Sequence, residues 1–247
     1  MFKLVTVLSV VLGTSSVFAS DADLNKYLTI KSVQVEVETV TKSGTVTSTL
    51  SEDVASVQDL PGMPQVDGRV SQNQKANIGQ VIQVAKDIIA LGEKVYEIVK
   101  KGKPVLNLKT APLSVLPKNS AGQAVDVFEM EGWSMPLSRK VRMSYKNGFG
   151  SEVVSFEYTI VFAHSGSMNG AGAYITAAQI IPSNVRVSWG FEFNADMRLV
   201  GLQNHGTKAN PVAGAIISLN YKVESVVTTI DTSDTYHLTG KGQIQTL

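Results

Sequence analysis

Most of the sequence alternates apolar and polar residues with a period of two, which limits the chain to folds built from β-strands. In residues 185–193 every second residue is apolar, and polar or small residues lie between them. Successive side chains of a strand point to opposite faces, so this alternation gives one buried and one exposed face. The pattern recurs through residues 105–247 with no helical stretch between the strands. Because parallel sheets need such helical crossovers, we predict a mainly β protein, an antiparallel β-sandwich, with 105–247 as its main sheet region.

Two β-hairpins can be placed from their turn residues. Residues 146–150 read Lys-Asn-Gly-Phe-Gly between two alternating segments, and Asn-Gly favours a tight turn with positive φ. Near the N-terminus, Val33, Val35 and Val37 alternate with polar residues before a Lys-Ser-Gly turn. We therefore expect an N-terminal hairpin within residues 20–55. Prolines and glycines then predict a loop over residues 56–74.

Residues 77–101 interrupt the period of two. Their apolar residues recur at steps of three, four and seven, with charged residues between them, which is the pattern of an amphipathic helix. Gly102 and Pro104 would end that helix. We predict one long α-helix over 77–101, packed on the sandwich. Its contact residues would be Ile78, Val81, Ile82, Ile88, Ile89, Val95 and Tyr96.

Two other roles are open to the same apolar face. It could join helices of several copies into an assembly, because the seven-residue repeat is regular. It could also detach and enter a bilayer, with its charged face lining a water-filled pore. The second role would make the chain a pore-forming or membrane-active protein that uses the helix at 77–101.

The first nineteen residues have the features of a secretory signal peptide. A short basic start is followed by an apolar run from Leu4 to Leu12, and Val17-Phe18-Ala19 suits a signal peptidase. We expect cleavage after Ala19, a single domain over 20–247, and a secreted location outside the cell, on its surface or in the periplasm. The absence of cysteine means that this domain needs a core rather than disulfides.

The charge balance argues against nucleic acid as a partner. The formal net charge is +1, and removal of Lys3 with the leader brings it to zero. Nucleic-acid binding relies on lysine and arginine that neutralise phosphates, so a neutral chain has no field to attract them. We expect an unknown protein or a cell-surface ligand as partner, with a homo-oligomer as an alternative and a membrane as a less favoured one.

No motif of catalysis, metal binding or cofactor binding is found. His164, His205 and His237 are too far apart for a local metal motif. The glycine-rich residues 164–172 match neither a nucleophile elbow nor a phosphate-binding loop, so we interpret them as a flexible loop between strands. We predict an exported protein without enzymatic activity or cofactor, acting as a binding, surface or assembly module. A hydrolase with an unrecognised site is the remaining alternative.

The two tryptophans differ in their sequence context. Trp189 belongs to the apolar alternation of residues 185–193, which predicts a buried side chain. Trp133 follows a glycine and precedes Pro136, outside any alternation. We therefore expect Trp133 to be exposed and to be a contact residue for a partner or membrane.

Overall fold

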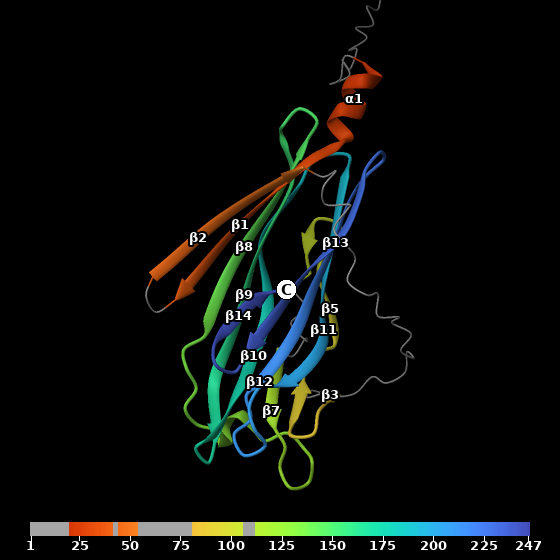
Figure 1. The fold of residues 1–247 in the computed structure, drawn as a ribbon. Coiled ribbons are helices and arrows are strands. Elements are labelled where there is room, and N and C mark those ends of the chain that lie inside the picture. The colour runs from red at the N-terminus through yellow and green to blue at the C-terminus, as the bar shows by residue number, and fades with distance from the viewer. Residues whose placement is uncertain (1–19, 42–43, 54–80, 106–111) are drawn as a thin grey trace, which may run out of the picture.

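The computed structural model describes residues 20–41, 44–53, 81–105 and 112–247 of the chain (Figure 1). Within these residues there is one α-helix, one short 3-10 helix and two antiparallel sheets. The helices are α1 (Asp21–Leu28) and η1 (Val127–Glu129). The strands are β1 (Ile30–Thr41), β2 (Gly44–Asp53), β3 (Val81–Val84), β4 (Ile88–Leu91), β5 (Val95–Lys100), β6 (Lys103–Pro104), β7 (Leu113–Pro117), β8 (Leu137–Asn147), β9 (Glu152–Met168), β10 (Ala171–Val187), β11 (Phe191–Asn204), β12 (Ala213–Ser225), β13 (Thr229–Thr239) and β14 (Gln243–Thr246).

The larger sheet has eight strands in the order β2-β1-β8-β9-β10-β7-β4-β3. Strand β8 leads into β9 through a turn at residues 148–151, where the sequence predicted one over 146–150, and β9 leads into β10. The N-terminal strand β1 pairs with both β2 and β8, so that Val35 lies opposite Leu50 on one side and Met143 on the other. We call this the large sheet.

The smaller sheet has six strands in the order β14-β13-β12-β11-β5-β6. Strands β11, β12, β13 and β14 follow one another along the chain as antiparallel neighbours. Strand β5 adds to the far side of β11, with Tyr96 opposite Met197. We call this the small sheet.

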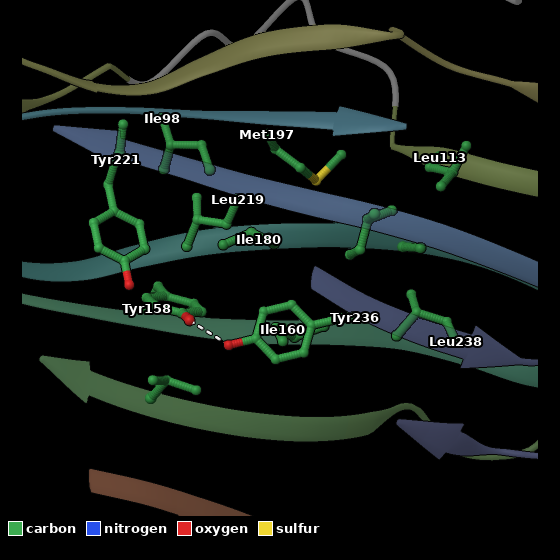
Figure 2. Packing of buried hydrophobic residues seen from close by; sticks show 14 of the residues in the cluster. Ile98, Leu113, Tyr158, Ile160, Ile180, Met197, Leu219, Tyr221, Tyr236 and Leu238 are labelled. Carbon is green, nitrogen blue, oxygen red and sulfur yellow. Dashed lines mark hydrogen bonds between the residues drawn. The ribbon is translucent and has the colours of Figure 1, made fainter. Parts of the chain in front are cut away.

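The core lies where side chains of the two sheets meet (Figure 2). Between Val154 and Phe162 every second residue of β9 is fully buried, as the alternation requires. The ring of Phe156 lies 4.9 Å from that of Phe193 on the small sheet, and the ring of Tyr158 lies 6.5 Å from that of Tyr236. Apolar burial on both sheets therefore holds them together. The fully buried residues of β9 on this face are Val154, Phe156, Tyr158, Ile160 and Phe162.

A polar cluster is buried within this core. The Tyr158 hydroxyl donates to Asp234 Oδ2 at 3.1 Å and lies 2.5 Å from the Tyr236 hydroxyl, while the Tyr221 hydroxyl donates to Asp234 Oδ1 at 3.4 Å. Burial raises the pKa of the Asp234 carboxyl, and the hydrogen bonds from the tyrosines act against that rise. Buried polar groups need such partners, and these link the large sheet to the small one.

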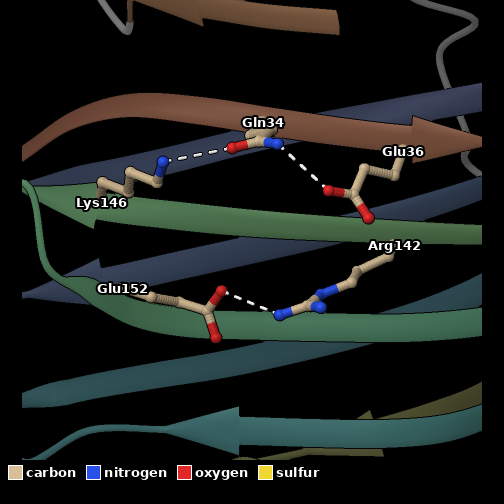
Figure 3. Close-up of polar contacts among 5 residues, drawn as sticks. All are labelled: Gln34, Glu36, Arg142, Lys146 and Glu152. Atoms are coloured by element: carbon tan, nitrogen blue, oxygen red, sulfur yellow. Dashed lines mark hydrogen bonds and ion pairs between the residues drawn. The ribbon is translucent and has the colours of Figure 1, made fainter. Parts of the chain in front are cut away.

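The outer face of the large sheet is polar (Figure 3). Lys146 Nζ donates to Gln34 Oε1 at 3.2 Å, and the amide of Gln34 donates to Glu36 Oε1 at 3.1 Å. Arg142 and Glu152 form an ion pair of 3.0 Å between β8 and β9. These residues alternate with the buried ones along their strands, so β1, β8 and β9 have one apolar and one polar face.

The predicted long helix is wrong. The described part of segment 77–101 forms β3, β4 and β5 instead, and residues 77–80, which include Ile78, lie outside the described residues. Ile88, Ile89 and Ala90 are all buried, so β4 is covered on both faces. A continuous apolar run can be a buried helix or a buried strand. The β-branched residues of this run favour the strand, as does Gly92, whose φ of 128° does not fit a helix. The pore-forming hypothesis was based on a helix at 77–101 and loses that basis.

The helix that does form, α1, has only eight residues. The hydroxyl of Ser20 caps its N-terminus by accepting a hydrogen bond from the backbone N–H of Asp23. Asp21 and Asp23 lie in its first turn, where the helix dipole favours negative charge. Among the described residues, no helix combines the length and the apolar character needed to cross a membrane.

The predicted burial of Trp189 and the predicted exposure of Trp133 are both wrong. Trp189 lies in the turn between β10 and β11 with 70% of its surface exposed. The alternation misleads because β10 ends at Val187 and Phe191 begins the next strand, so Trp189 belongs to neither. Trp133 is partly buried, packs on Gly166 and donates from Nε1 to the carbonyl oxygen of Val127 at 3.4 Å.

Candidate functional site

An open polar pocket lies at the end of the protein opposite α1. It has a volume of about 490 Å³ and is built from four connections between strands. These are the β3–β4 turn, the segment after β7, the β9–β10 turn and the β11–β12 loop. We call it the loop-end pocket. Its lining residues are Lys86, Asp87, Pro117, Lys118, Asn119, Ser120, Gly122, Met168, Asn169, Ala171, Tyr174, Lys208, Ala209 and Pro211.

The β9–β10 turn forms one wall and corrects a prediction. Residues 164–172 are not a flexible loop, because β9 extends to Met168 and β10 begins at Ala171. Asn169 and Gly170 make the turn with φ of 52° and 72°, which these two residue types tolerate best. The N–H of Gly170 donates to Glu131 Oε1 at 3.1 Å, so the turn is anchored to the preceding loop.

The wall after β7 is held by hydrogen bonds to the backbone. Lys118 Nζ donates to the carbonyl oxygens of Ala85 and Lys86, which ties this wall to the β3–β4 turn. Asn119 Oδ1 accepts hydrogen bonds from the N–H groups of Ala121 and Gln123. These bonds fix the loop that carries Ser120 and Gly122. Two of the four connections therefore form one connected wall.

Three lysines and one carboxylate surround the pocket. Lys86, Lys118 and Lys208 come from three different connections, and Asp87 is the single acidic residue of the lining. Burial raises the pKa of the Tyr174 hydroxyl, and the negative charge of Asp87 adds to the rise. The hydroxyl of Tyr174 therefore stays protonated, and the pocket keeps an excess of positive charge.

A pair of histidines joins the β11–β12 loop, which carries His205, to strand β13, which carries His237. His205 Nε2 lies 2.9 Å from His237 Nε2, which lets one ring donate a hydrogen bond to the other. Burial lowers the pKa of His237, the neighbouring His205 lowers it further, and a hydrogen bond with Gln245 acts in the opposite direction. Two protonated rings would both be donors and would repel each other. The pair is therefore stable only while at least one ring is neutral.

We expect this pair to make the fold sensitive to acid. Because the folded state holds the His237 proton more weakly than the unfolded state, stability falls as pH drops below about 6.5, until the pH passes the folded pKa. His237→Gln should make this fall smaller, since glutamine does not titrate. Urea unfolding of both proteins from about pH 7 to about pH 5 measures the difference. If the free energy of unfolding falls equally with pH in the wild type and in His237→Gln, His237 is not the source of the acid sensitivity.

The predicted contact residues do not meet at the loop-end pocket. Ile88 and Ile89 are buried in β4, Val95 and Tyr96 belong to β5, and Trp133 packs on Gly166. Tyr96 has a structural role, because its hydroxyl accepts a hydrogen bond from the N–H of Ile180 on the large sheet. Burial raises the pKa of that hydroxyl to about 12. Val81 and Ile82 lie in β3, and the structure describes their backbone alone.

The pocket residues themselves were missed. Lys86-Asp87 and Lys118-Asn119-Ser120 are short polar interruptions between apolar segments, which is a turn signal. That signal places each turn but does not show which turns converge. In the described part of the chain, no group of three or more histidine, aspartate and glutamate residues could hold a metal ion. The chain matches no family model, no curated protein and no solved structure.

Proposed function

We propose that the chain is an exported β-sandwich binding protein that holds an acidic saccharide, sulfated or carboxylated, in its loop-end pocket. The two antiparallel sheets with a shared core support the sandwich arrangement. The observation that carries the binding function is the convergence of Lys86, Lys118 and Lys208 around one open hollow. Lysine is a common partner of anionic groups.

The rest of the lining fits a sugar better than a simple anion. Asn119, Ser120 and Asn169 offer amide and hydroxyl groups, which pair with sugar hydroxyls. Met168, which is partly buried, and Ala209, which is exposed, add apolar surface that can pack on the carbon face of a sugar ring. A ligand that combines charge, hydroxyls and a small apolar face would use all three kinds of group.

The composition of the pocket also supports binding without catalysis. Hydrolysis of a glycoside uses two carboxyl groups on either side of the bond, and Asp87 is the single carboxylate of the lining. Nucleophilic catalysis pairs a hydroxyl with a base, and no histidine contributes to the lining described. The pocket is therefore suited to holding a ligand unchanged.

Binding to a panel of sulfated, carboxylated and neutral oligosaccharides tests the proposal. We expect binding to acidic members that weakens as salt is added, because exposed charges are screened. Lys86→Ala with Lys208→Ala should weaken binding about threefold to tenfold, the range for losing two exposed ion pairs. Lys31→Ala with Lys94→Ala removes two exposed lysines outside the pocket and serves as the matched control.

Two results would refute the pocket as the binding site. One is equal binding of acidic and neutral sugars. The other is an equal loss of affinity in the two double variants, which would show that only overall charge matters.

A further inference from the structure

The opposite end of the protein exposes apolar side chains on three hairpin turns. Trp189 is 70% exposed on the β10–β11 turn, and Val226 is 84% exposed on the β12–β13 turn. Phe149, on the β8–β9 turn, and Val227, beside Val226, are each about half exposed. Large exposed apolar residues that gather at one end mark an interaction surface. We call this surface, together with α1, the helix end (Figure 1).

Helix α1 and the residue after it hold the three turns together. The N–H of Gly148 donates to the carbonyl oxygen of Lys26, which fixes the β8–β9 turn. The ring of Tyr27 stacks on Trp189 with centroids 6.4 Å apart, and the hydroxyl of Ser225 donates to the carbonyl oxygen of Leu28 at 2.7 Å. Each turn is thus bonded or stacked to the same short helix. The apolar side chains are presented on a rigid frame, which lowers the entropy lost on binding.

Lysines flank these apolar residues. Lys26 Nζ lies 4.5 Å above the ring of Phe149. Lys101, in the β5–β6 turn, and Lys103, at the start of β6, are both exposed and lie near the end of β10, where the β10–β11 turn begins. The position of the β5–β6 turn is fixed by a hydrogen bond from the N–H of Lys101 to Asn194 Oδ1 at 3.1 Å. The same turn packs on β10, because a Cβ on Gly102 would lie 2.8 Å from Val187.

We propose that the helix end docks on the surface of an anionic lipid bilayer. Tryptophan prefers the level of the lipid headgroups, where its ring is apolar and its N–H is hydrated. Lysines beside it can reach the phosphates while their carbon chains remain in apolar surroundings. Each lysine close to an anionic surface adds to the attraction. The three flanking lysines complement that surface and outnumber the two carboxylates in the first turn of α1, Asp21 and Asp23. Turn tips suit the shallow immersion of a peripheral protein better than a flat protein interface.

This inference is independent of the loop-end pocket. Figure 1 shows α1 at one end of the long strands and β3 and β7, whose connections line the pocket, toward the other. A protein docked through its helix end would hold the pocket away from the bilayer. Failure of either binding test leaves the other proposal standing.

Trp189 provides a direct reporter of docking. The chain has two tryptophans, so Trp133→Phe leaves Trp189 as the single one. The exported form from Ser20 would be mixed with vesicles of phosphatidylcholine, with or without phosphatidylserine. With phosphatidylserine we expect the emission of Trp189 to move to shorter wavelength. Lipids brominated on their acyl chains should quench it, since the indole enters the interface.

Variants separate the apolar from the charged contribution. Trp189→Ser should reduce co-sedimentation with phosphatidylserine vesicles roughly tenfold, because an exposed apolar side chain no longer enters the interface. Lys101→Ala with Lys103→Ala should reduce it by about fivefold per lysine and remove most of the preference for phosphatidylserine. The control is Phe128→Ser, which removes a fully exposed aromatic ring from outside the three turns.

Several outcomes would overturn the proposal. One is a Trp189 emission that stays unchanged with all vesicles. Another is an equal loss of sedimentation for Phe128→Ser and Trp189→Ser. A third is a purified protein that binds the wild type but not Trp189→Ser, while vesicles bind neither the wild type nor the variant. Circular dichroism of each variant shows that a loss does not come from unfolding.

Discussion

Phe156→Ala is expected to lower the free energy of unfolding by about 3–5 kcal/mol. The ring of Phe156 in β9 is fully buried, and its centroid lies 5.1 Å from that of Tyr158 and 4.9 Å from that of Phe193. Its loss removes apolar contacts on both sheets and leaves a cavity that neighbouring strands cannot fill. The substitution therefore tests whether the two sheets share one core.

Phe128→Ala is the matched control, because the same atoms are removed from a ring that is 97% exposed. We expect its unfolding free energy to stay within about 0.5 kcal/mol of the wild type. Denaturant unfolding followed by circular dichroism measures both variants. Similar effects for Phe128→Ala and Phe156→Ala would contradict the assignment of the core.

Gly240→Ala is expected to cost about 3 kcal/mol. A Cβ at this position would lie 2.0 Å from the carbonyl oxygen of Ala173, a backbone atom of β10. Gly240 also donates to the carbonyl oxygen of Ala213 and accepts from the N–H of Ser165. The turn after β13 therefore cannot move away from β10 without breaking bonds to both sheets. The contact restricts this position to glycine.

Gly201→Ala is the control for that substitution. The nearest atom to its added Cβ is 3.9 Å away, which is an ordinary contact. We expect a change within about 1 kcal/mol, because alanine also reduces the entropy of the unfolded chain. Equal stability of the two variants in thermal unfolding would show that β10 and the turn after β13 are not in close contact.

The sequence predicted the β-strands because their pattern is local. Residues 154–162 alternate in a way that a half-buried strand requires, and the structure buries every second one. The prediction failed for residues 81–101. Strand β4 is buried on both faces, so its apolar run has no period of two. The short turns before and after β4 interrupt the alternation, and the apolar residues of the segment then recur at the spacing of a helix. Local pattern alone does not distinguish these two cases.

The candidate site was harder to predict, because its residues come from four separate connections. Lys86, Lys118 and Lys208 are each ordinary surface lysines in the sequence. Their proximity depends on the strand order β10-β7-β4-β3 and on the packing of the small sheet against it. Trp189 was predicted as buried for a related reason, since the end of β10 is set by a turn and not by the alternation.

An amide NMR titration of the chain from Ser20 onward with a sulfated disaccharide tests the central claim most directly. We predict residue-specific shifts at residues 85–87, 117–122, 168–171 and 208–211, the four connections that line the loop-end pocket. The three turns of the helix end, at residues 148–151, 188–190 and 226–228, should keep their shifts. No residue-specific shift, or shifts confined to residues outside the four connections, would contradict the proposal that this pocket binds an acidic saccharide.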